Sequence, residues 1–216
     1  GHMKHLGSLI AAVVGVLSLG MGPADAGPIF LTGHDPDFHS QPFAGAGGNL
    51  LGKGLSFATN GTYNSGASTK FLWVEATPAD LGGIPGGHLY GVNGLLSIGL
   101  TQGTNFDTVD GAGFAALSNA ALSNYTAIGI ASTFGGMLSS AELNALNSRA
   151  ADIAAFINAG GGLFASAECY PCGANLAGSA AGLFGYLPVT VTSIGANPPF
   201  TVTAYGATLG LTNADV

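Results

Sequence analysis

A strand–helix–strand pattern in the middle of the chain most constrains the fold. Ser139 and Glu142 have the spacing of a capping box, in which each side chain satisfies a free amide at a helix start. Apolar residues then recur at helical spacing until the glycines at 160–162, which are typical of a helix end. Apolar runs at 126–132 and 162–167 flank this helix and predict strands. Such a unit is nearly always right-handed, so we expect these two strands to be parallel.

The rest of the chain repeats this alternation. Strands are expected at 28–33 and 70–76, and exposed or edge strands at 189–193 and 200–205; helices are expected at 48–58, 87–100, 113–124 and 173–185. Alternating elements predict an open α/β, flavodoxin-like parallel sheet with helices on both faces.

The N-terminus has the pattern of a secretory signal. Residues 1–2 precede a methionine and are typical of an expression scar, whereas 3–26 contain a short basic stretch and then an uncharged apolar run at 6–21. Small residues at 24 and 26 fit a cleavage site. We therefore expect an exported protein, located in the periplasm, at the cell surface or outside the cell. Its mature part, 27–216, has the length of a single domain.

The charge balance excludes some partners. Four Lys and Arg residues stand against 11 Asp and Glu residues, for a net charge of −7. Nucleic acids and anionic lipid surfaces need a basic surface, so neither is expected. No stretch after the signal is long and apolar enough to span a bilayer. The expected partner is a small ligand or a cell-surface component.

The loop after the first expected strand is the strongest candidate site. It holds His34, Asp35, Asp37 and His39 in a chain that is only 7% charged. One interpretation is a metal site formed by His34, Asp37 and His39, because imidazole and carboxylate suit Zn²⁺ or a related divalent ion. A second is acid–base catalysis by a histidine that a carboxylate orients. A third is a hydrogen-bonded turn that Asp35 initiates.

The parallel topology predicts which other groups join this loop. Ligands of open α/β sheets bind beyond the carboxyl ends of the strands. Further polar residues follow expected strands: Glu75, Ser132, Thr133, Glu168 and Cys169. Glu168 is either an acid or ligand with a raised pKa or the partner of a backbone amide. His88 either covers this edge from a loop or is solvated. The expected catalytic set is His34 and Asp35 with Glu168.

The two cysteines, Cys169 and Cys172, form a C-x-x-C pair. An exported chain meets an oxidising compartment, which favours a local structural disulfide. The same spacing after a strand also suits a redox-active pair.

Two stretches resemble known proteins. Residues 30–39 (FLTGHDPDFH) look like the opening of a family of exported bacterial proteins that often carry a PEP-CTERM sorting tail. Residues 156–165 (FINAGGGLFA) resemble the helix-to-strand turn of the class I glutamine amidotransferase-like fold, which includes trehalose-utilisation-type domains. The resemblance spans roughly residues 28–185. The chain ends without the sorting tail, so either the domain is truncated at its C-terminus or the resemblance to this family is a looser one.

The resemblance also implies a chemistry that this chain lacks. Those amidotransferases place a cysteine on a strand-to-helix turn and a histidine later in the chain, and here no histidine follows His88. We therefore expect an exported protein of unknown activity with an amidotransferase-like fold but no glutaminase triad, which binds a metal or small ligand at the first loop. The alternatives are a metal-assisted or acid–base hydrolase and a thiol–disulfide redox protein.

Overall fold

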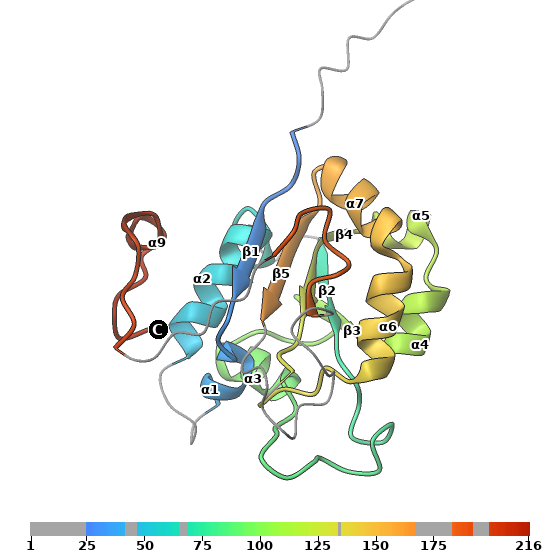
Figure 1. Cartoon of the computed structure of the whole chain (residues 1–216), viewed down its shortest axis with the longest axis horizontal. Helices are drawn as coiled ribbons and strands as arrows, with labels where there is room; N and C mark the ends of the chain where they lie inside the picture. The colour runs from blue at the N-terminus through green and yellow to red at the C-terminus, as the bar shows by residue number, and fades with distance from the viewer. Residues whose placement is uncertain (1–24, 42–46, 65–68, 134, 167–182, 192–198) are drawn as a thin grey trace, which may run out of the picture.

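The computed structural model describes residues 25–41, 47–64, 69–133, 135–166, 183–191 and 199–216. Its centre is a five-stranded sheet in the order β1-β5-β4-β2-β3, with every neighbouring pair parallel (Figure 1). The strands are β1 (Ile29–Thr32), β2 (Lys70–Val74), β3 (Phe106–Val109), β4 (Tyr125–Ile130) and β5 (Gly162–Ser166). This sheet confirms the predicted open α/β, flavodoxin-like fold.

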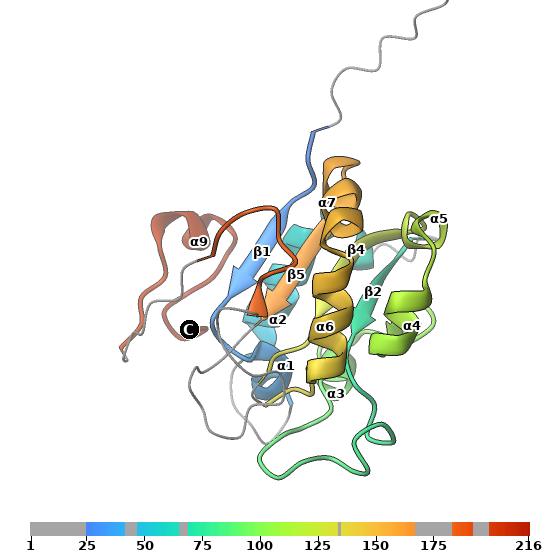
Figure 2. The same cartoon turned by 45° about the vertical axis from the view of Figure 1, so that its right-hand side comes forward.

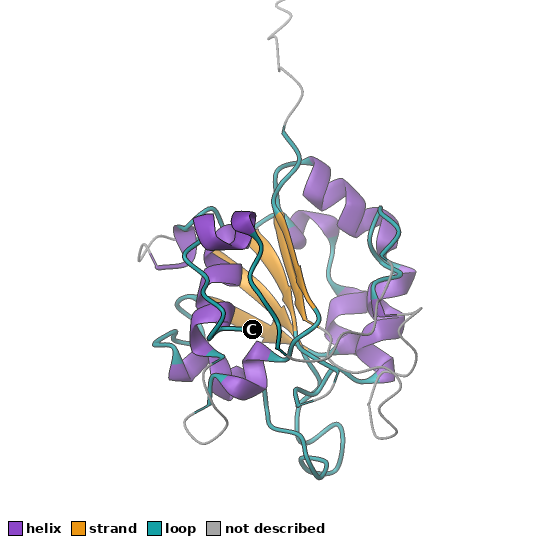
Figure 3. Cartoon of the chain, turned by 60° about the vertical axis from the view of Figure 1, so that its left-hand side comes forward, coloured by secondary structure: helices purple, strands orange, loops and turns teal. Residues whose placement is uncertain are grey.

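Helices cover both faces of the sheet, as Figures 2 and 3 show. One face carries α2 (Gly48–Ala58), with α1 (Pro36–His39) and α3 (Val92–Ser97) beside it. The other carries α4 (Gly111–Ala116), α5 (Asn119–Leu122), α6 (Ser140–Ser148) and α7 (Ala150–Asn158). A short 3-10 helix (Thr62–Asn64) follows α2, and α9 (Ala204–Thr208) lies near the C-terminus. In the part of the chain described, no helix combines the length and the apolar character needed to cross a bilayer.

Aromatic side chains fill the core on the face of the sheet that α2 covers. Trp73 stacks on Phe164, with ring centroids 6.2 Å apart, and Phe164 stacks on Phe30 at 5.8 Å. Phe71 and Phe106 stack at 5.6 Å. The apolar residues of β2, β4 and β5 are almost all buried because helices cover both faces, which is why their sequences are continuous apolar runs.

Helix α2 approaches the sheet closely through glycine. A Cβ added at Gly54 would lie 2.6 Å from a ring carbon of Phe164 and 2.8 Å from one of Phe30. A Cβ added at Gly162, where β5 begins, would overlap the carbonyl oxygen of Ala58. Glycine at these positions therefore lets the helix and the sheet touch.

The helix expected behind the capping box is confirmed, but it is divided. Ser139 and Glu142 form the box as predicted. The helix breaks at Arg149, which caps both α6 and α7 with φ −108° and ψ 20°. The buried guanidinium donates to the carbonyl oxygen of Phe114 and to Asn119. These contacts hold Arg149 against α4 and α5, and the helix is interrupted at this residue between α6 and α7.

Two further predictions needed correction within the described residues. The helix expected at 113–124 is α4 and α5, because Leu117 is extended and Ser118 caps α5 by accepting from the Ala121 N–H. The strand expected at 200–205 is wrong, since α9 begins at Ala204.

Other predicted elements lie partly outside the described residues. Residues 189–191 are in no strand, and the remainder of 189–193 is outside the described part. Most of the helix expected at 173–185 is also outside it. Strand β3 was not predicted.

Candidate functional site

The sheet has a topological switch point between β2 and β4. After β2 the chain moves outward to β3, and after β4 it moves to β5, towards the opposite edge. The segments that follow β2 and β4 therefore diverge beyond the carboxyl ends of the strands, which is where open parallel sheets bind ligands. Glu75 follows β2 directly, and Ser132 and Thr133 follow β4; all three are buried.

Helix α1 brings Asp37 to this switch point from the edge strand β1. The Asp37 side chain is fully buried, and its Oδ2 accepts from the Ser132 N–H at 2.9 Å; the carboxyl group also has a hydrogen bond with the Ser132 side chain. The other carboxyl oxygen, Oδ1, is buried and has no hydrogen-bond partner. Burial raises the pKa of Asp37 above its ordinary value, although the hydrogen bonds from Ser132 act in the opposite direction.

Glu75 is the most heavily hydrogen-bonded carboxyl group of this edge. It accepts from the indole N–H of Trp73 at 2.8 Å and from the backbone N–H of Gly91 at 2.6 Å. The backbone N–H groups of Val92 and Met137 donate to it at 3.1 Å each. Glu75 therefore joins the end of β2 to the start of α3 and to the segment before α6.

Asp37 and Glu75 form a close carboxyl pair. A Cβ added at Gly91 would lie 2.8 Å from Asp37 Oδ2 and 2.8 Å from Glu75 Oε1, so both carboxyl groups flank the same backbone point. Burial, and then the charge of Asp37, raise the pKa of Glu75 to about 8. Because neighbouring carboxyl groups cannot both ionise cheaply in a buried site, the pair retains a proton at neutral pH.

A second pair, Asp35 and His39, flanks Asp37 in the sequence and joins the N-cap of α1 to its last residue. His39 Nε2 is 3.3 Å from Asp35 Oδ1; the Asp35 side chain is 3% exposed and the His39 side chain 46%. A Cβ added at Gly135 would overlap Asp35 Oδ2, so the segment after β4 packs against this carboxylate. A buried carboxylate that holds one ring nitrogen fixes the orientation of the imidazole. This arrangement can exchange protons with a ligand at the edge.

The structure separates some of the predicted site residues. The His34 ring packs edge-on against Phe200, with centroids 5.1 Å apart. The described residues contain no group of three or more His, Cys, Asp or Glu side chains that could hold a metal ion, so His34, Asp37 and His39 are not brought together as a metal centre. His88 does cover the edge: it is buried, and its Nδ1 is 2.9 Å from the carbonyl oxygen of Gly136.

The remaining candidates, Glu168, Cys169 and Cys172, lie outside the described residues. Conversely, sequence reasoning placed Glu75 at this edge but assigned it no role. The available signal was a glutamate directly after a fully apolar strand segment in a chain with few charges.

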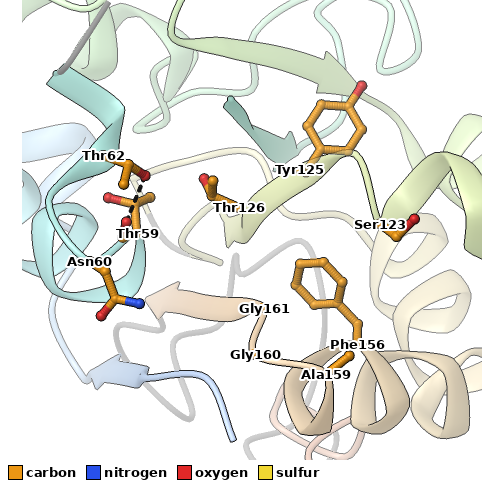
Figure 4. A pocket seen from close by; sticks show the side chains of 10 residues that line it. All are labelled: Thr59, Asn60, Thr62, Ser123, Tyr125, Thr126, Phe156, Ala159, Gly160 and Gly161. Carbon is orange, nitrogen blue, oxygen red and sulfur yellow. Dashed lines mark hydrogen bonds between the residues drawn. The ribbon is translucent and has the colours of Figure 1, made fainter. Parts of the chain in front are cut away.

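A cavity of about 290 Å³ lies at the opposite edge of the sheet, near the amino ends of β4 and β5 (Figure 4). Its lining is uncharged: Thr59, Asn60, Thr62, Ser123, Tyr125, Thr126, Phe156, Ala159, Gly160 and Gly161. Several of its hydroxyl groups donate to backbone carbonyls, among them Thr59 to Leu55 and Thr126 to Lys70. The acidic and histidine side chains described above lie at the other edge.

Comparison of the chain with protein-family models, with curated proteins and with solved structures gave no match. The resemblance to amidotransferase-like and PEP-CTERM-type proteins therefore stays a prediction.

Proposed function

We propose that this chain is an exported α/β protein that carries out acid–base chemistry on a small polar ligand at the carboxyl edge of its sheet. His39 is the group that exchanges the proton, and Asp35 positions it. The observation that carries the proposal is the contact between a buried carboxylate and a half-exposed imidazole at this edge. Imidazole transfers protons near neutral pH, and an adjacent carboxylate fixes its orientation.

The geometry favours His39 over His34 as the working histidine. His39 has the carboxylate of Asp35 within 3.3 Å, whereas the His34 ring packs against the aromatic ring of Phe200. In this proposal Asp35 is the carboxylate that orients a histidine, as expected from the sequence, but that histidine is His39 and not His34. Export, which rests on the signal-like pattern at 3–26, belongs to the same proposal, as does descent from an amidotransferase-like ancestor without its glutaminase triad.

The metal-assisted alternative has less support. A catalytic zinc site needs three protein ligands, and no such group occurs among the described side chains. The redox alternative depends on Cys169 and Cys172, so thiol titration of the protein with and without mild reductant is its direct test.

Hydrolysis of p-nitrophenyl acetate, an activated ester that reports imidazole reactivity, tests the proposal. We expect His39→Gln to lower the second-order rate constant at least about tenfold, since positioned acid–base groups contribute roughly 10²–10⁴-fold. Asp35→Asn should lower it several-fold. His34→Gln is the matched control and should leave the rate unchanged. Circular dichroism and Trp73 fluorescence would establish that each variant is folded.

Equal losses in His39→Gln and His34→Gln would refute the proposal. Such a result would mean that the ester reacts with any accessible imidazole and that the contact with Asp35 adds nothing. An unchanged rate in His39→Gln would refute it as well.

A further inference from the structure

We propose that Asp37 and Glu75 form a one-proton latch, in which a single proton on Asp37 holds the carboxyl edge closed. The latch joins three segments that are far apart in the sequence. Asp37 fixes α1 to Ser132 after β4, while Glu75 fixes Gly91 at the start of α3 and Met137 before α6. The inference is independent of the chemistry of the surface histidines.

The hydrogen bonds of Glu75 show that it is the ionised partner. Oε1 accepts from the N–H groups of Gly91 and Met137, and Oε2 accepts from those of Trp73 and Val92. Each oxygen thus has two donors, which fill the acceptor sites of a carboxylate. A proton on either oxygen would displace one of these donors.

The hydrogen bonds of Asp37 favour the protonated form of this carboxyl group. Its Oδ2 accepts from Ser132, and its Oδ1 is buried without a partner. A negative oxygen left unpaired in the interior is strongly unfavourable. A proton on Oδ1 removes that charge, while the neighbouring carboxylate of Glu75 keeps its four donors.

Among the described side chains, no salt bridge from a lysine or arginine reaches Asp37 or Glu75. In the described part of the chain, the lysine and arginine ion pairs are with Asp107 and Asp152, away from the latch. The titratable groups on the same segments are Asp35 and His39, which flank Asp37, and His88 and Tyr90 before α3. Burial, and then the charge of Glu75, raise the pKa of Tyr90 to about 12.

Loss of the proton would therefore place two neighbouring negative charges in a buried site. Water that enters between α1 and the start of α3 would solvate both carboxylates and reduce their repulsion at the smallest energetic cost. Gly94 marks the contact that would open, because a Cβ added there would overlap the backbone carbonyl of Asp37. The edge is closed while Asp37 is protonated and opens when it ionises.

Thermal unfolding from about pH 5 to pH 9.5 tests the latch, with Asp37→Asn, Glu75→Gln and the surface control Asp107→Asn. Asparagine keeps the shape of a protonated aspartate and its donor. We expect Asp37→Asn to flatten the fall in melting temperature with rising pH and to melt above the wild type at pH 9. Glu75→Gln should melt below the wild type throughout, because its amide N–H₂ would face N–H donors. The control should follow the wild-type profile.

Two spectroscopic measurements on the unmodified chain keep the test independent of how the variants fold. Infrared spectra at neutral pH should contain the C=O stretch of a buried protonated carboxyl, and Asp37→Asn should lack it. Acrylamide quenching of Trp73, the single tryptophan, should rise between about pH 7 and 9.5 in the native state. The latch is refuted if that stretch is absent, if quenching stays flat, or if Asp37→Asn melts below the wild type at pH 9.

Discussion

Alanine substitutions on α2 test how closely this helix lies on the sheet. Gly52 and Gly54 occupy the same helix, but their surroundings differ. A Cβ at Gly52 would meet the Tyr63 hydroxyl at 3.7 Å, an ordinary contact, whereas one at Gly54 would press into the rings of Phe164 and Phe30 at 2.6 and 2.8 Å. The two substitutions change helix propensity equally and differ only in packing.

The expected changes in the free energy of unfolding have opposite signs. Gly52→Ala should stabilise the protein by about 0.5–1 kcal/mol, the ordinary gain of alanine over glycine within a helix. Gly54→Ala has the same gain, but overpacking costs about 1–3 kcal/mol, so we expect a net loss of about 1 kcal/mol. Gly162→Ala meets the backbone of Ala58, which cannot rotate away, and should cost about 3 kcal/mol or more.

Urea unfolding followed by Trp73 fluorescence measures these differences, because Trp73 is buried and stacks on Phe164. The slopes with respect to urea should be equal among the variants, so that the midpoints report stability. If Gly54→Ala proved as stable as Gly52→Ala, α2 could not lie as close to Phe164 and Phe30 as the 2.6 and 2.8 Å approaches require.

Two further predictions concern buried carboxyl groups. Asp37 and Glu75 share one proton, and the pair releases it with a pKa of about 8, against 4.5 for a free glutamate, so the folded state keeps a proton that the unfolded chain releases. The free energy of unfolding should therefore fall by up to about 4–5 kcal/mol between these pH values and level off above pH 8, as urea titrations at fixed pH would measure. A constant value across that window would contradict the burial of this group. Glu142→Ala removes the acceptor of the Gly111 and Ser139 N–H groups, so it should lower the free energy of unfolding by about 2 kcal/mol in the same assay. Lys70→Met breaks a partly exposed ion pair and should lower it by less than about 1 kcal/mol.

Patterns within a few neighbouring residues were enough to predict some of the helices and strands. The capping box at Ser139 and the apolar runs of β4 and β5 are strong local patterns, and the structure confirms them. Strand β3 gave no such signal, because of its four residues only Phe106 is buried and Asp107 pairs with Lys70. Its pairing with β2, far away in sequence, makes it a strand.

The breaks between α4 and α5 and between α6 and α7 also depend on contacts with residues distant in the sequence. Helical periodicity continues through Leu117 and Arg149, yet the chain bends at both. Long-range contacts decide there, such as the bond from Arg149 to the Phe114 carbonyl.

For the candidate site, the rule that ligands bind beyond the carboxyl ends of parallel strands predicted which residues lie at this edge. The pattern of residue types did not predict which side chains touch each other. Parallel strands placed Asp37, Glu75 and Ser132 at one edge, as expected. The sequence could not show which groups touch, because that depends on the direction of each side chain around α1. His34 therefore turned out to pack on an aromatic ring, and His39 to hold the carboxylate.

The position of β1 has a consequence for how the protein acquires its structure. β1 is the first strand of the chain, yet its neighbour in the sheet is β5, more than a hundred residues later. Contacts of such long range form late, because the intervening loop must first be closed at an entropic cost. A growing polypeptide thus cannot pair β1 until β5 has emerged, and Asp35 and Asp37, which directly follow β1, would reach their places late.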